Sequence, residues 1–440
     1  MSIQAVKGTR DLYPEQYAPI QHIFDVWRNV SLRHGFDEFE GPTLEYLELY
    51  REKSGDELVG QLFTLTDAGG RELALRPEMT PTLARMVAAK INALAKPIKW
   101  FCMPRLFRGE NVQRGRLREF YQWNVDVIGT ADVIADAECI LVGVEALREL
   151  GLKTDDFMVH ISNRRLIASM LTACGIAPKG HGGAYAILDK AGKIPEAELA
   201  RRWGERYESS LRFAELMDLL RCERLDDLRS SIGRVGTATA ELDDALAETD
   251  RLFSLIENFG ISEFCRLNLR VVRGLAYYTG PVFEFFDRAE SERAICGGGR
   301  YDDLLGKLGK SREPAVGFGM GDVVLRLMLE DRGLLGNSRK ASSIFVADAV
   351  GGLRDRLYSV VASLRRAGYY AEFSYQQQNV GKQLKAADKR GCRLVIILGD
   401  ETRDRSVVQI KNMKAGDSRE VSLDLLLTNP FDCIGRPDAV

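Results

Sequence analysis

Two stretches of this sequence place arginine side chains where an anionic substrate could bind. Residues 273–287 read RGLAYYTGPVFEFFD, so the guanidinium of Arg273 precedes two adjacent phenols, a Thr-Gly-Pro corner and a strand-like run. Residues 104–118 read PRLFRGENVQRGRLR and contain five arginines. Guanidinium groups bind carboxylates and phosphates through charge-assisted, often paired hydrogen bonds. Both stretches therefore suggest anion chemistry, although a solvated basic hairpin explains the second stretch equally well.

Polar residues on both sides of the arginine-rich segment predict a common site. Arg108 and Glu110 alternate along one predicted strand, and Gln122 and Asp126 share one face of the returning strand, because strand side chains repeat every two residues. These groups therefore converge on one face of a hairpin. Antiparallel sheets often present a polar face to water, but the aromatic residues among these positions favour a ligand site.

The segment RPEMT at residues 76–80 joins a predicted hairpin to a helix. Thr80 is a suitable N-cap with Pro81 at the first helical position, and capping alone explains both residues. Capping does not explain Glu78, whose carboxylate could bind an ammonium group. Of the two interpretations, capping is favoured when the segment is taken alone.

Glycines cluster in two strand-like segments, AICGGGRYDDLL and PAVGFGMGD. Glycine inside a strand indicates close approach by a ligand or by another backbone, or else a bulge or corner. Neither segment is a P-loop, since no GK[ST] follows, and neither is a dinucleotide fingerprint. The glycines fit a flat floor for a purine and close packing equally well.

The elements expected to position these residues alternate between sheet and helix. The patterns predict helices at residues 17–33, from 80 and at 131–150, hairpins at 62–77 and 100–128, and a strand at 158–164. Residues 165–262 read as almost entirely helical, and the strand pattern resumes after them. A polar linker follows Gly333, and residues 341–430 alternate in the order βαβαββ, which predicts a separate α/β domain.

Composition restricts the class of protein. The chain has 440 residues, 45% hydrophobic and 28% charged, with a net charge of −2, which is typical of a folded protein of about three domains. Eight scattered cysteines without a CxxC pair, and four histidines, give no metal-ligand spacing, so no metal held by the protein is expected. The charged N-terminus and the absence of an apolar run of ~20 residues predict a cytoplasmic protein that does not cross a membrane.

Taken in order, the motifs resemble those of class II aminoacyl-tRNA synthetases, and within that class the histidyl-tRNA synthetase family, over almost the whole chain. The first predicted helix with FEGPTLE resembles motif 1, FRGENVQRGRLREFYQ resembles motif 2, and GFGMG resembles motif 3. RPEMT also matches, and RGLAYYTG together with CGGGRYDDLL resembles the two signatures of the histidine enzymes. The last two are specific, whereas motif 1 alone would be weak.

The resemblance implies an α/β (α+β) fold. It consists of a class II antiparallel-sheet catalytic domain with a helical insertion, followed by a C-terminal α/β anticodon-binding domain. The expected catalytic domain comprises residues 1–164 and 263–333, the insertion 165–262, and the anticodon-binding domain 341–430. Motif 1 also implies a homodimer, the commonest symmetric arrangement.

The resemblance also implies the roles of individual residues, with ATP and histidine as substrates, histidine tRNA as partner, and Mg²⁺ accompanying ATP. Arg273 and Arg108 would be the catalytic cations at the α-phosphate. Histidine would be bound by Glu78, Met79, Thr80, Gln122, Asp126, Arg273, Tyr277 and Tyr278. ATP would be bound by Arg108, Glu110, Phe120, Gly317 and Gly319. The tRNA would be contacted by Arg114, Arg116 and Arg118.

Three departures from the family pattern point to a variant branch. Motif 3 normally ends in Gly-x-Glu-Arg, whereas this chain has Asp322 followed by two valines, and Arg326 lies too far around the helix to replace the arginine. Ala276 stands where the family has aspartate, and Asn111 where an arginine is usual. An active histidine ligase is the favoured interpretation. The alternatives are a non-catalytic histidine-sensing paralogue, like the regulatory subunit of ATP phosphoribosyltransferase, and a tRNA-binding sensor module.

Overall fold

The computed structural model describes residues 3–51, 60–191, 194–207, 212–235, 239–271, 278–288, 294–303, 305–306, 312–335 and 343–436. The predicted site residues Arg273 and Tyr277, and the departure at Ala276, lie outside these described residues. The chain divides into two compact units, Met1–Gly336 and Asn337–Val440. Each unit is described by itself.

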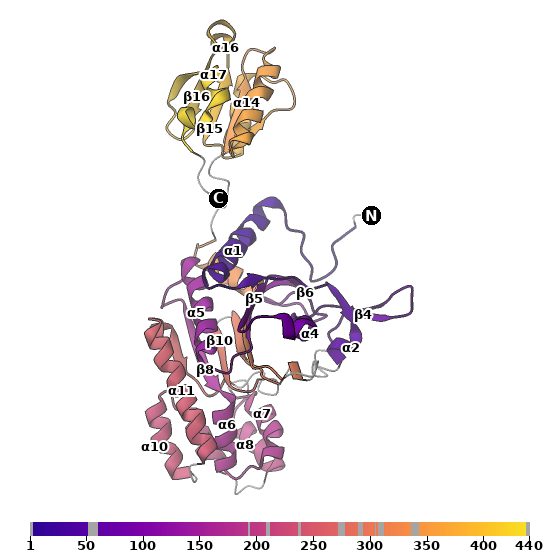
Figure 1. Cartoon of the computed structure of the whole chain (residues 1–440), viewed down its shortest axis with the longest axis vertical. Coiled ribbons are helices and arrows are strands. Elements are labelled where there is room, and N and C mark those ends of the chain that lie inside the picture. The colour runs from indigo at the N-terminus through magenta and orange to yellow at the C-terminus, as the bar shows by residue number, and fades with distance from the viewer. Residues whose placement is uncertain are drawn as a thin grey trace. The chain divides into compact units, whose positions relative to one another are not determined.

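A nine-stranded sheet forms the centre of the first unit (Figure 1). The order is β1-β5-β7-β12-β11-β10-β8-β9, with β6 paired to β7, and only the β1–β5 and β8–β9 pairs are parallel. Strands that follow the helical segment pair with β7 and β8, so the sheet resumes as predicted. The strands are β1 (Asp37–Glu38), β5 (Ile98–Cys102), β6 (Arg105–Phe107), β7 (Glu119–Ile128), β8 (Phe157–Asn163), β9 (Cys265–Leu267), β10 (Pro281–Asp287), β11 (Cys296–Arg300) and β12 (Ala315–Gly321).

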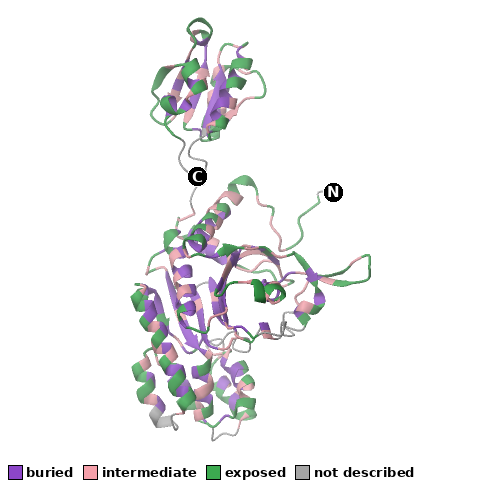
Figure 2. Cartoon of the chain, in the orientation of Figure 1, coloured by how far each residue is buried: buried purple, intermediate pink, exposed green. Residues whose placement is uncertain are grey.

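The main core lies between one face of this sheet and four helices, α1 (Pro14–Arg33), α5 (Ile134–Glu149), the end of α11 (Ala240–Asn258) and α13 (Asp322–Asp331). In α1, apolar residues recur three and four positions apart and form one buried stripe. Trp27 of this stripe stacks on Trp123 of β7, with ring centroids 5.7 Å apart. Figure 2 shows the strands largely buried and the outer helix faces exposed. The predicted first helix is confirmed, beginning three residues earlier than expected, at Pro14.

The helical segment between β8 and β9 has its own apolar core. Figure 1 shows α6, α7, α8, α10 and α11 together beyond one end of the large sheet. Its first and last helices contact each other, so the chain leaves and re-enters the sheet at adjacent strands. We retain residues 165–262 as its proposed bounds. The helices are α6 (Arg164–Ala173), α7 (His181–Leu188), α8 (Glu196–Arg206), α9 (Phe213–Leu220), α10 (Leu225–Val235) and α11 (Ala240–Asn258).

A small three-stranded sheet precedes the arginine-rich hairpin. β2 (Leu44–Tyr46) and β3 (Thr64–Thr66) flank β4 (Glu72–Leu75), and the antiparallel β3–β4 pair confirms the predicted hairpin. α2 (Leu47–Arg51) and α4 (Thr80–Lys90) adjoin it. The prediction that Thr80 caps α4 is wrong: the helix already includes Thr80, Met79 is the N-cap, and no side chain caps it. Proline is tolerated throughout a first turn, where its missing N–H is not needed, so the helix can begin one residue earlier.

The second unit is an α/β domain built on a five-stranded sheet of order β14-β13-β15-β16-β17. The first three strands in this order are parallel and the last two are antiparallel additions. The predicted βαβαββ order is confirmed, with three short helices in addition. The elements are β13 (Ser343–Asp348), α14 (Arg354–Arg366), β14 (Tyr370–Phe373), α15 (Val380–Lys389), β15 (Leu394–Leu398), α16 (Asp400–Arg405), β16 (Val407–Asn412), β17 (Ser418–Ser422), α17 (Leu423–Thr428) and α18 (Pro430–Ile434).

Candidate active site

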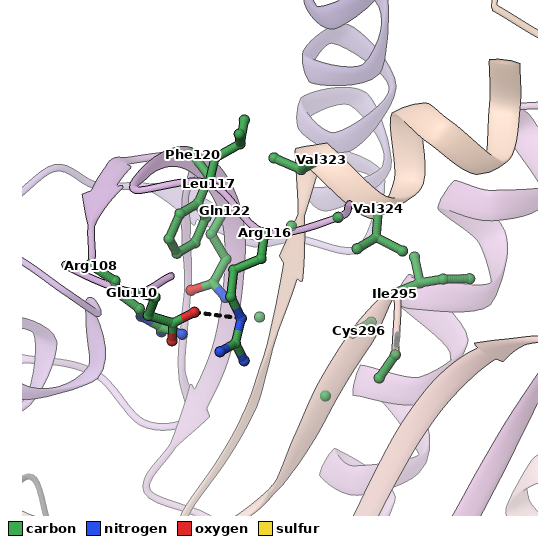
Figure 3. A pocket seen from close by; sticks show the side chains of 15 residues that line it. Arg108, Glu110, Arg116, Leu117, Phe120, Gln122, Ile295, Cys296, Val323 and Val324 are labelled. Atoms are coloured by element: carbon green, nitrogen blue, oxygen red, sulfur yellow. Dashed lines mark ion pairs between the residues drawn. The ribbon is translucent and has the colours of Figure 1, made fainter. Parts of the chain in front are cut away.

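A pocket of about 180 Å³ opens where β7, β11 and β12 approach the start of α13, and three of its lining residues, Ile295, Cys296 and Val324, also belong to the main core. Strand periodicity explains the other lining residues: Trp123 of β7 and Phe318 of β12 face the core, so their neighbours Gln122 and Gly319 face the pocket. Figure 3 shows the arginine-rich hairpin on one side of the pocket and the start of α13 on the other. The pocket-lining residues include Arg108, Glu110, Arg116, Phe120, Gln122, Cys296, Gly297, Gly319, Val323 and Val324.

Arg108 is fixed at the edge of this pocket by two contacts. Its Nε donates a hydrogen bond to the carbonyl oxygen of Pro77 at 2.9 Å, and its guanidinium lies 5.3 Å from the ring centre of Phe120. A cation held over an aromatic face keeps its orientation without an ion-pair partner that would neutralise it. The guanidinium is therefore oriented beside the segment that leads into α4.

Glu110 and Arg116 form an ion pair inside the pocket, with Nε and Oε2 2.5 Å apart (Figure 3). The side chain of Arg118 turns back toward the loop, and its Nε donates to the carbonyl oxygen of Glu110 at 3.0 Å. Arg114 is exposed and pairs with Asp331 at 3.1 Å. The three arginines that the sequence grouped together thus have three different surroundings, and only Arg116 lines the pocket.

The glycines of β12 leave room for side chains of β7. A Cβ atom on Gly319 would lie 2.7 Å from Nε2 of Gln122, and a Cβ atom on Gly317 would collide with the carboxylate of Asp126. Packing against neighbouring side chains therefore explains both glycines, and Gly319 also lines the pocket. In β11, a Cβ atom on Gly298 would lie 2.6 Å from the carbonyl oxygen of Gly317. The structure thus contains both features that the sequence allowed for these glycines: close packing between strands and the floor of a pocket.

Asp126 lies at the bottom of the same sheet face, buried beneath Tyr301. The Tyr301 hydroxyl donates a hydrogen bond to Oδ1 of Asp126. Burial raises the pKa of Asp126 to about 7, although the hydrogen bond from Tyr301 acts in the opposite direction. Tyr301 is anchored by its neighbour Arg300, whose Nε pairs with Asp136 at 3.1 Å. The carboxyl group of Asp126 can therefore change its charge near neutral pH.

The start of α4 faces the same region. Burial first, and then the nearby carboxylates of Glu284, Glu78 and Asp126, raise the pKa of Tyr278. Tyr278 therefore lies within electrostatic reach of both Glu78 and Asp126. Met79 is 1% exposed, and its side chain lies against Gly41, away from the pocket-lining residues.

Some residues of the site have no signal in the sequence patterns. Tyr301 stands inside the quoted CGGGRYDDLL segment, but a hydroxyl that bonds Asp126 gives no signal in a local pattern. Val323 and Val324 line the pocket where the family pattern has a glutamate and an arginine. Arg326 lies on α13 with its Nη1 3.5 Å from Glu330, and it is not a lining residue.

Among the described residues, no group of three or more His, Cys, Asp or Glu side chains could hold a metal ion. In the part of the chain that the structure describes, no helix has the length and apolar character needed to cross a membrane.

Two family models match the chain. The model described as "Histidyl-tRNA synthetase" matches residues 8–322, and the model described as "Anticodon binding domain" matches residues 343–429. The first covers the large sheet, the helical segment and the pocket except for Val323 and Val324. The second covers the second unit from β13 to α17.

Curated relatives match nearly the whole chain. The histidine–tRNA ligase of Opitutus terrae is 38% identical over 96% of both chains, and the chloroplastic/mitochondrial enzyme of Arabidopsis thaliana is 36% identical over 96% of this chain and 86% of its own. Among solved structures, histidyl-tRNA synthetase from Nostoc sp. PCC 7120 has the same fold, with a TM-score of 0.82 at 24% identity over 97% of this chain and 98% of its own. A Bacillus halodurans structure described as an ATP phosphoribosyltransferase regulatory subunit/histidyl-tRNA synthetase has a TM-score of 0.75 at 26% identity, covering 91% and 99%.

Proposed function

The chain belongs to the histidyl-tRNA synthetase family, and we propose that it is a histidine–tRNA ligase. In this reaction histidine and ATP form histidyl-adenylate and pyrophosphate, and the histidyl group then passes to the 3′ end of histidine tRNA. The observation that carries the proposal is the pocket itself. It combines Arg108, Glu110, Phe120, Gln122 and Gly319, residues assigned to ATP or histidine from the sequence, on one face of the sheet beside Asp126.

In the activation step, a carboxylate oxygen of histidine attacks the α-phosphorus of ATP, and the bond to the leaving pyrophosphate breaks. Two anions approach each other, so fixed cations lower the barrier. Arg108, held by Pro77 and Phe120, supports this role. Arg273, outside the described residues, is proposed as the second cation. No general base is required, because the carboxylate is already ionised at neutral pH.

We propose that the histidine side chain is recognised by Asp126, with Tyr277 and Tyr278 completing the imidazole pocket. A carboxylate buried beneath a tyrosine hydroxyl can accept a hydrogen bond from an imidazole N–H. Glu78, Thr80 and Gln122, with the backbone of Met79, would bind the α-ammonium group. The hydroxyl of Thr80 supports this, because it is not used to cap the start of α4.

For ATP, we propose that the adenine amino group lies near Glu110, that the ring stacks on Phe120, and that Gly317 and Gly319 keep the floor flat. Mg²⁺ would arrive with the phosphates and neutralise the leaving pyrophosphate.

In the second step, a hydroxyl of the terminal adenosine attacks the carbonyl carbon of the adenylate, and AMP leaves. Arg114, Arg116 and Arg118 are proposed to contact the acceptor end. Arg114 fits this role best, because its side chain is exposed and its ion pair with Asp331 is a surface pair, whereas Arg116 and Arg118 are engaged within the hairpin. The second unit would bind the anticodon. We further propose that the protein is cytoplasmic and, from the motif 1 resemblance, that it forms a homodimer.

The deciding experiment is ATP–pyrophosphate exchange by the purified chain with each of histidine, another amino acid and no amino acid. Exchange that depends on histidine is expected, followed by charging of histidine tRNA. Absence of exchange under conditions where histidine binds would contradict the proposal.

Histidine binding without pyrophosphate exchange would support the alternative of a histidine-sensing paralogue. The similarity to the Bacillus halodurans structure keeps this alternative open, since its description names a regulatory subunit as well as a synthetase. The second unit argues for the ligase, because a sensor of histidine alone has no need of a domain that matches the anticodon-binding model.

A further inference from the structure

The N-terminal segment before α1 is attached to the arginine-rich hairpin. The carbonyl oxygen of Gly8 accepts a hydrogen bond from the backbone N–H of Arg118 at 2.9 Å. Gly8 has a φ of +89°, and a Cβ atom there would lie 2.8 Å from Cγ of Arg118 and 2.9 Å from Cγ2 of Val112. A glycine is therefore needed both for the backbone conformation and for the close approach. Residues 8–10 are held directly against the loop that carries Arg116.

Two residues further on, Arg10 forms an ion pair with the first residue of α13. Nη2 of Arg10 lies 2.8 Å from Oδ2 of Asp322, whose side chain is 0% exposed. The other carboxylate oxygen of Asp322 accepts the backbone N–H of Tyr121, also at 2.8 Å. One buried carboxylate thus joins the N-terminal segment, β7 and α13.

These contacts lie directly behind the walls of the pocket. Phe120 and Gln122, the neighbours of Tyr121, line the pocket, and so do Val323 and Val324, the neighbours of Asp322. Neither Arg10 nor Asp322 lines it. Any effect of this ion pair on a ligand must therefore be transmitted through the backbones that it joins.

The charges around Asp322 indicate that its buried, ionised carboxylate needs Arg10 as a counter-ion. Burial raises the pKa of Asp322, while Arg10 and the Tyr121 amide act in the opposite direction. A buried carboxylate that loses its cation is unfavourable in the ionised state. Within the described residues, Nη1 of Arg10 is buried without a hydrogen-bond partner, so its stabilisation depends on the Asp322 contact.

We propose that the Arg10–Asp322 ion pair is the positioning device that sets the shape of the ATP pocket in this chain, where the glutamate and arginine of motif 3 are absent. The inference rests on the proposed function for the identity of the ligand. The pair fixes three walls at once: the hairpin loop through Gly8, β7 through Tyr121 and the start of α13 through Asp322. Arg10 is a positioning residue and does not touch ATP.

The test measures the Kd of a non-hydrolysable ATP analogue by calorimetry, alongside histidine-dependent exchange and thermal unfolding. Asp322→Asn and Arg10→Gln should each raise this Kd by about tenfold or more, because small displacements of binding groups are costly. The double variant Arg10→Gln/Asp322→Asn should bind better than the product of the two single effects predicts, since both substitutions remove one interaction. Arg10→Lys keeps the charge and should bind close to wild type. The KM for histidine should change less than that for ATP.

Arg332→Gln is the matched control for stability. Arg332 sits at the far end of α13 and pairs with Asp156 at 2.6 Å and with Asp287 at 2.8 Å, and none of the three lines the pocket. It should lower the unfolding temperature without changing the Kd.

An unchanged Kd in Asp322→Asn and Arg10→Gln, with a loss of stability like that of Arg332→Gln, would overturn the inference. If a single variant fails to fold, the double variant and Arg10→Lys still test the proposal. A wild-type Kd for the ATP analogue in the folded double variant would also overturn the inference. A wild-type chain that binds the analogue but shows no exchange would contradict the ligase function alone.

Discussion

At the scale of single residues, a comparison of Arg108 with Arg105 distinguishes the proposed catalytic cation from an ordinary surface charge. Both lie over an aromatic ring, Arg108 over Phe120 at 5.3 Å and Arg105 over Tyr121 at 4.7 Å. Strand alternation places Phe120 in the pocket, whereas Tyr121 packs edge-on against Phe24 of α1 on the opposite face. The two arginines are therefore chemically alike, but only Arg108 faces the proposed α-phosphate.

Arg108→Ala is expected to reduce histidine-dependent pyrophosphate exchange by about 10²–10³-fold, the usual cost of removing one fixed group that stabilises transition-state charge. Arg105→Ala should leave the rate within about threefold of wild type, since an exposed ion pair such as that of Arg105 with Glu119 contributes little. Steady-state exchange on both variants checks the prediction. Equal losses in the two would remove Arg108 from its proposed role.

Asp126 should make histidine binding depend on pH. Its pKa is raised to about 7 by burial, so the carboxyl group is ionised above that pH and neutral below it. If the carboxylate accepts the imidazole N–H, the KM for histidine should rise as the pH falls, by about tenfold for each unit below the pKa. Histidine itself gains a proton near pH 6.5, and Asp126→Asn separates the two effects.

The amide side chain introduced by Asp126→Asn cannot ionise, so only the ionisation of histidine should remain in the KM profile. The measurement is KM for histidine from about pH 5.5 to about pH 8.5 at saturating ATP, a range that spans both ionisations. A profile in Asp126→Asn that matches the wild type would show that Asp126 does not set the pH dependence.

At the scale of elements, the sequence predicted what depends on local periodicity and missed what depends on distant contacts. The first helix, the β3–β4 hairpin and the alternation of the second unit follow from the spacing of apolar residues and turn residues. The Asp126–Tyr301 hydrogen bond joins residues 175 positions apart, and the Arg10–Asp322 pair joins residues 312 positions apart. No pattern within either segment specifies its partner, because the pairing results from the order of strands in the sheet.

The glycines of β12 illustrate this limit. From sequence, Gly317 and Gly319 fitted a purine floor and tight packing equally well. In the structure, Gly317 lies opposite Asp126 and accommodates its carboxylate, whereas Gly319 lies opposite Asn124 and accommodates the side chain of Gln122. Gln122 ends in a flexible amide that can rotate away, whereas the Asp126 carboxylate is buried and bonded to Tyr301. Substitution of the two glycines should therefore have different consequences.

Gly319→Ala should lower activity more than stability. The new methyl group displaces the Gln122 amide, and a local rearrangement of about 1.4 kcal/mol at the pocket corresponds to roughly tenfold in KM. Gly317→Ala should destabilise the fold as well, since Asp126 has no alternative position. Gly204→Ala in α8, where a Cβ atom meets nothing within 4 Å, is the control; it should leave the KM unchanged and raise the unfolding temperature slightly, because alanine has the higher helix propensity. Exchange kinetics and thermal unfolding of the three variants test this; a wild-type KM in folded Gly319→Ala would contradict the assigned position of Gln122.

At the scale of the whole molecule, the chain separates two tasks between two compact units. The pocket, the buried Asp126 and the hairpin all belong to the first unit, and the second unit matches the anticodon-binding model over residues 343–429. The net charge of −2 gives no sign of a nucleic-acid partner. The family of the chain implies a tRNA partner, and we propose that the local arginine cluster and the second unit bind different parts of it.

Removal of residues 337–440 should therefore separate amino acid activation from tRNA charging. Because the pocket lies within residues 1–336, histidine-dependent exchange should persist, while the KM for histidine tRNA should rise by about 10²-fold, the usual loss when one of two linked binding modules is removed. An acceptor-stem minihelix without an anticodon is the matched control substrate, and its KM should be the same for the full chain and the truncated chain. Thermal unfolding establishes that the truncated chain is folded. If the folded, truncated chain charges intact tRNA with an unchanged KM, the second unit does not bind the anticodon; if it loses exchange, activation requires both units.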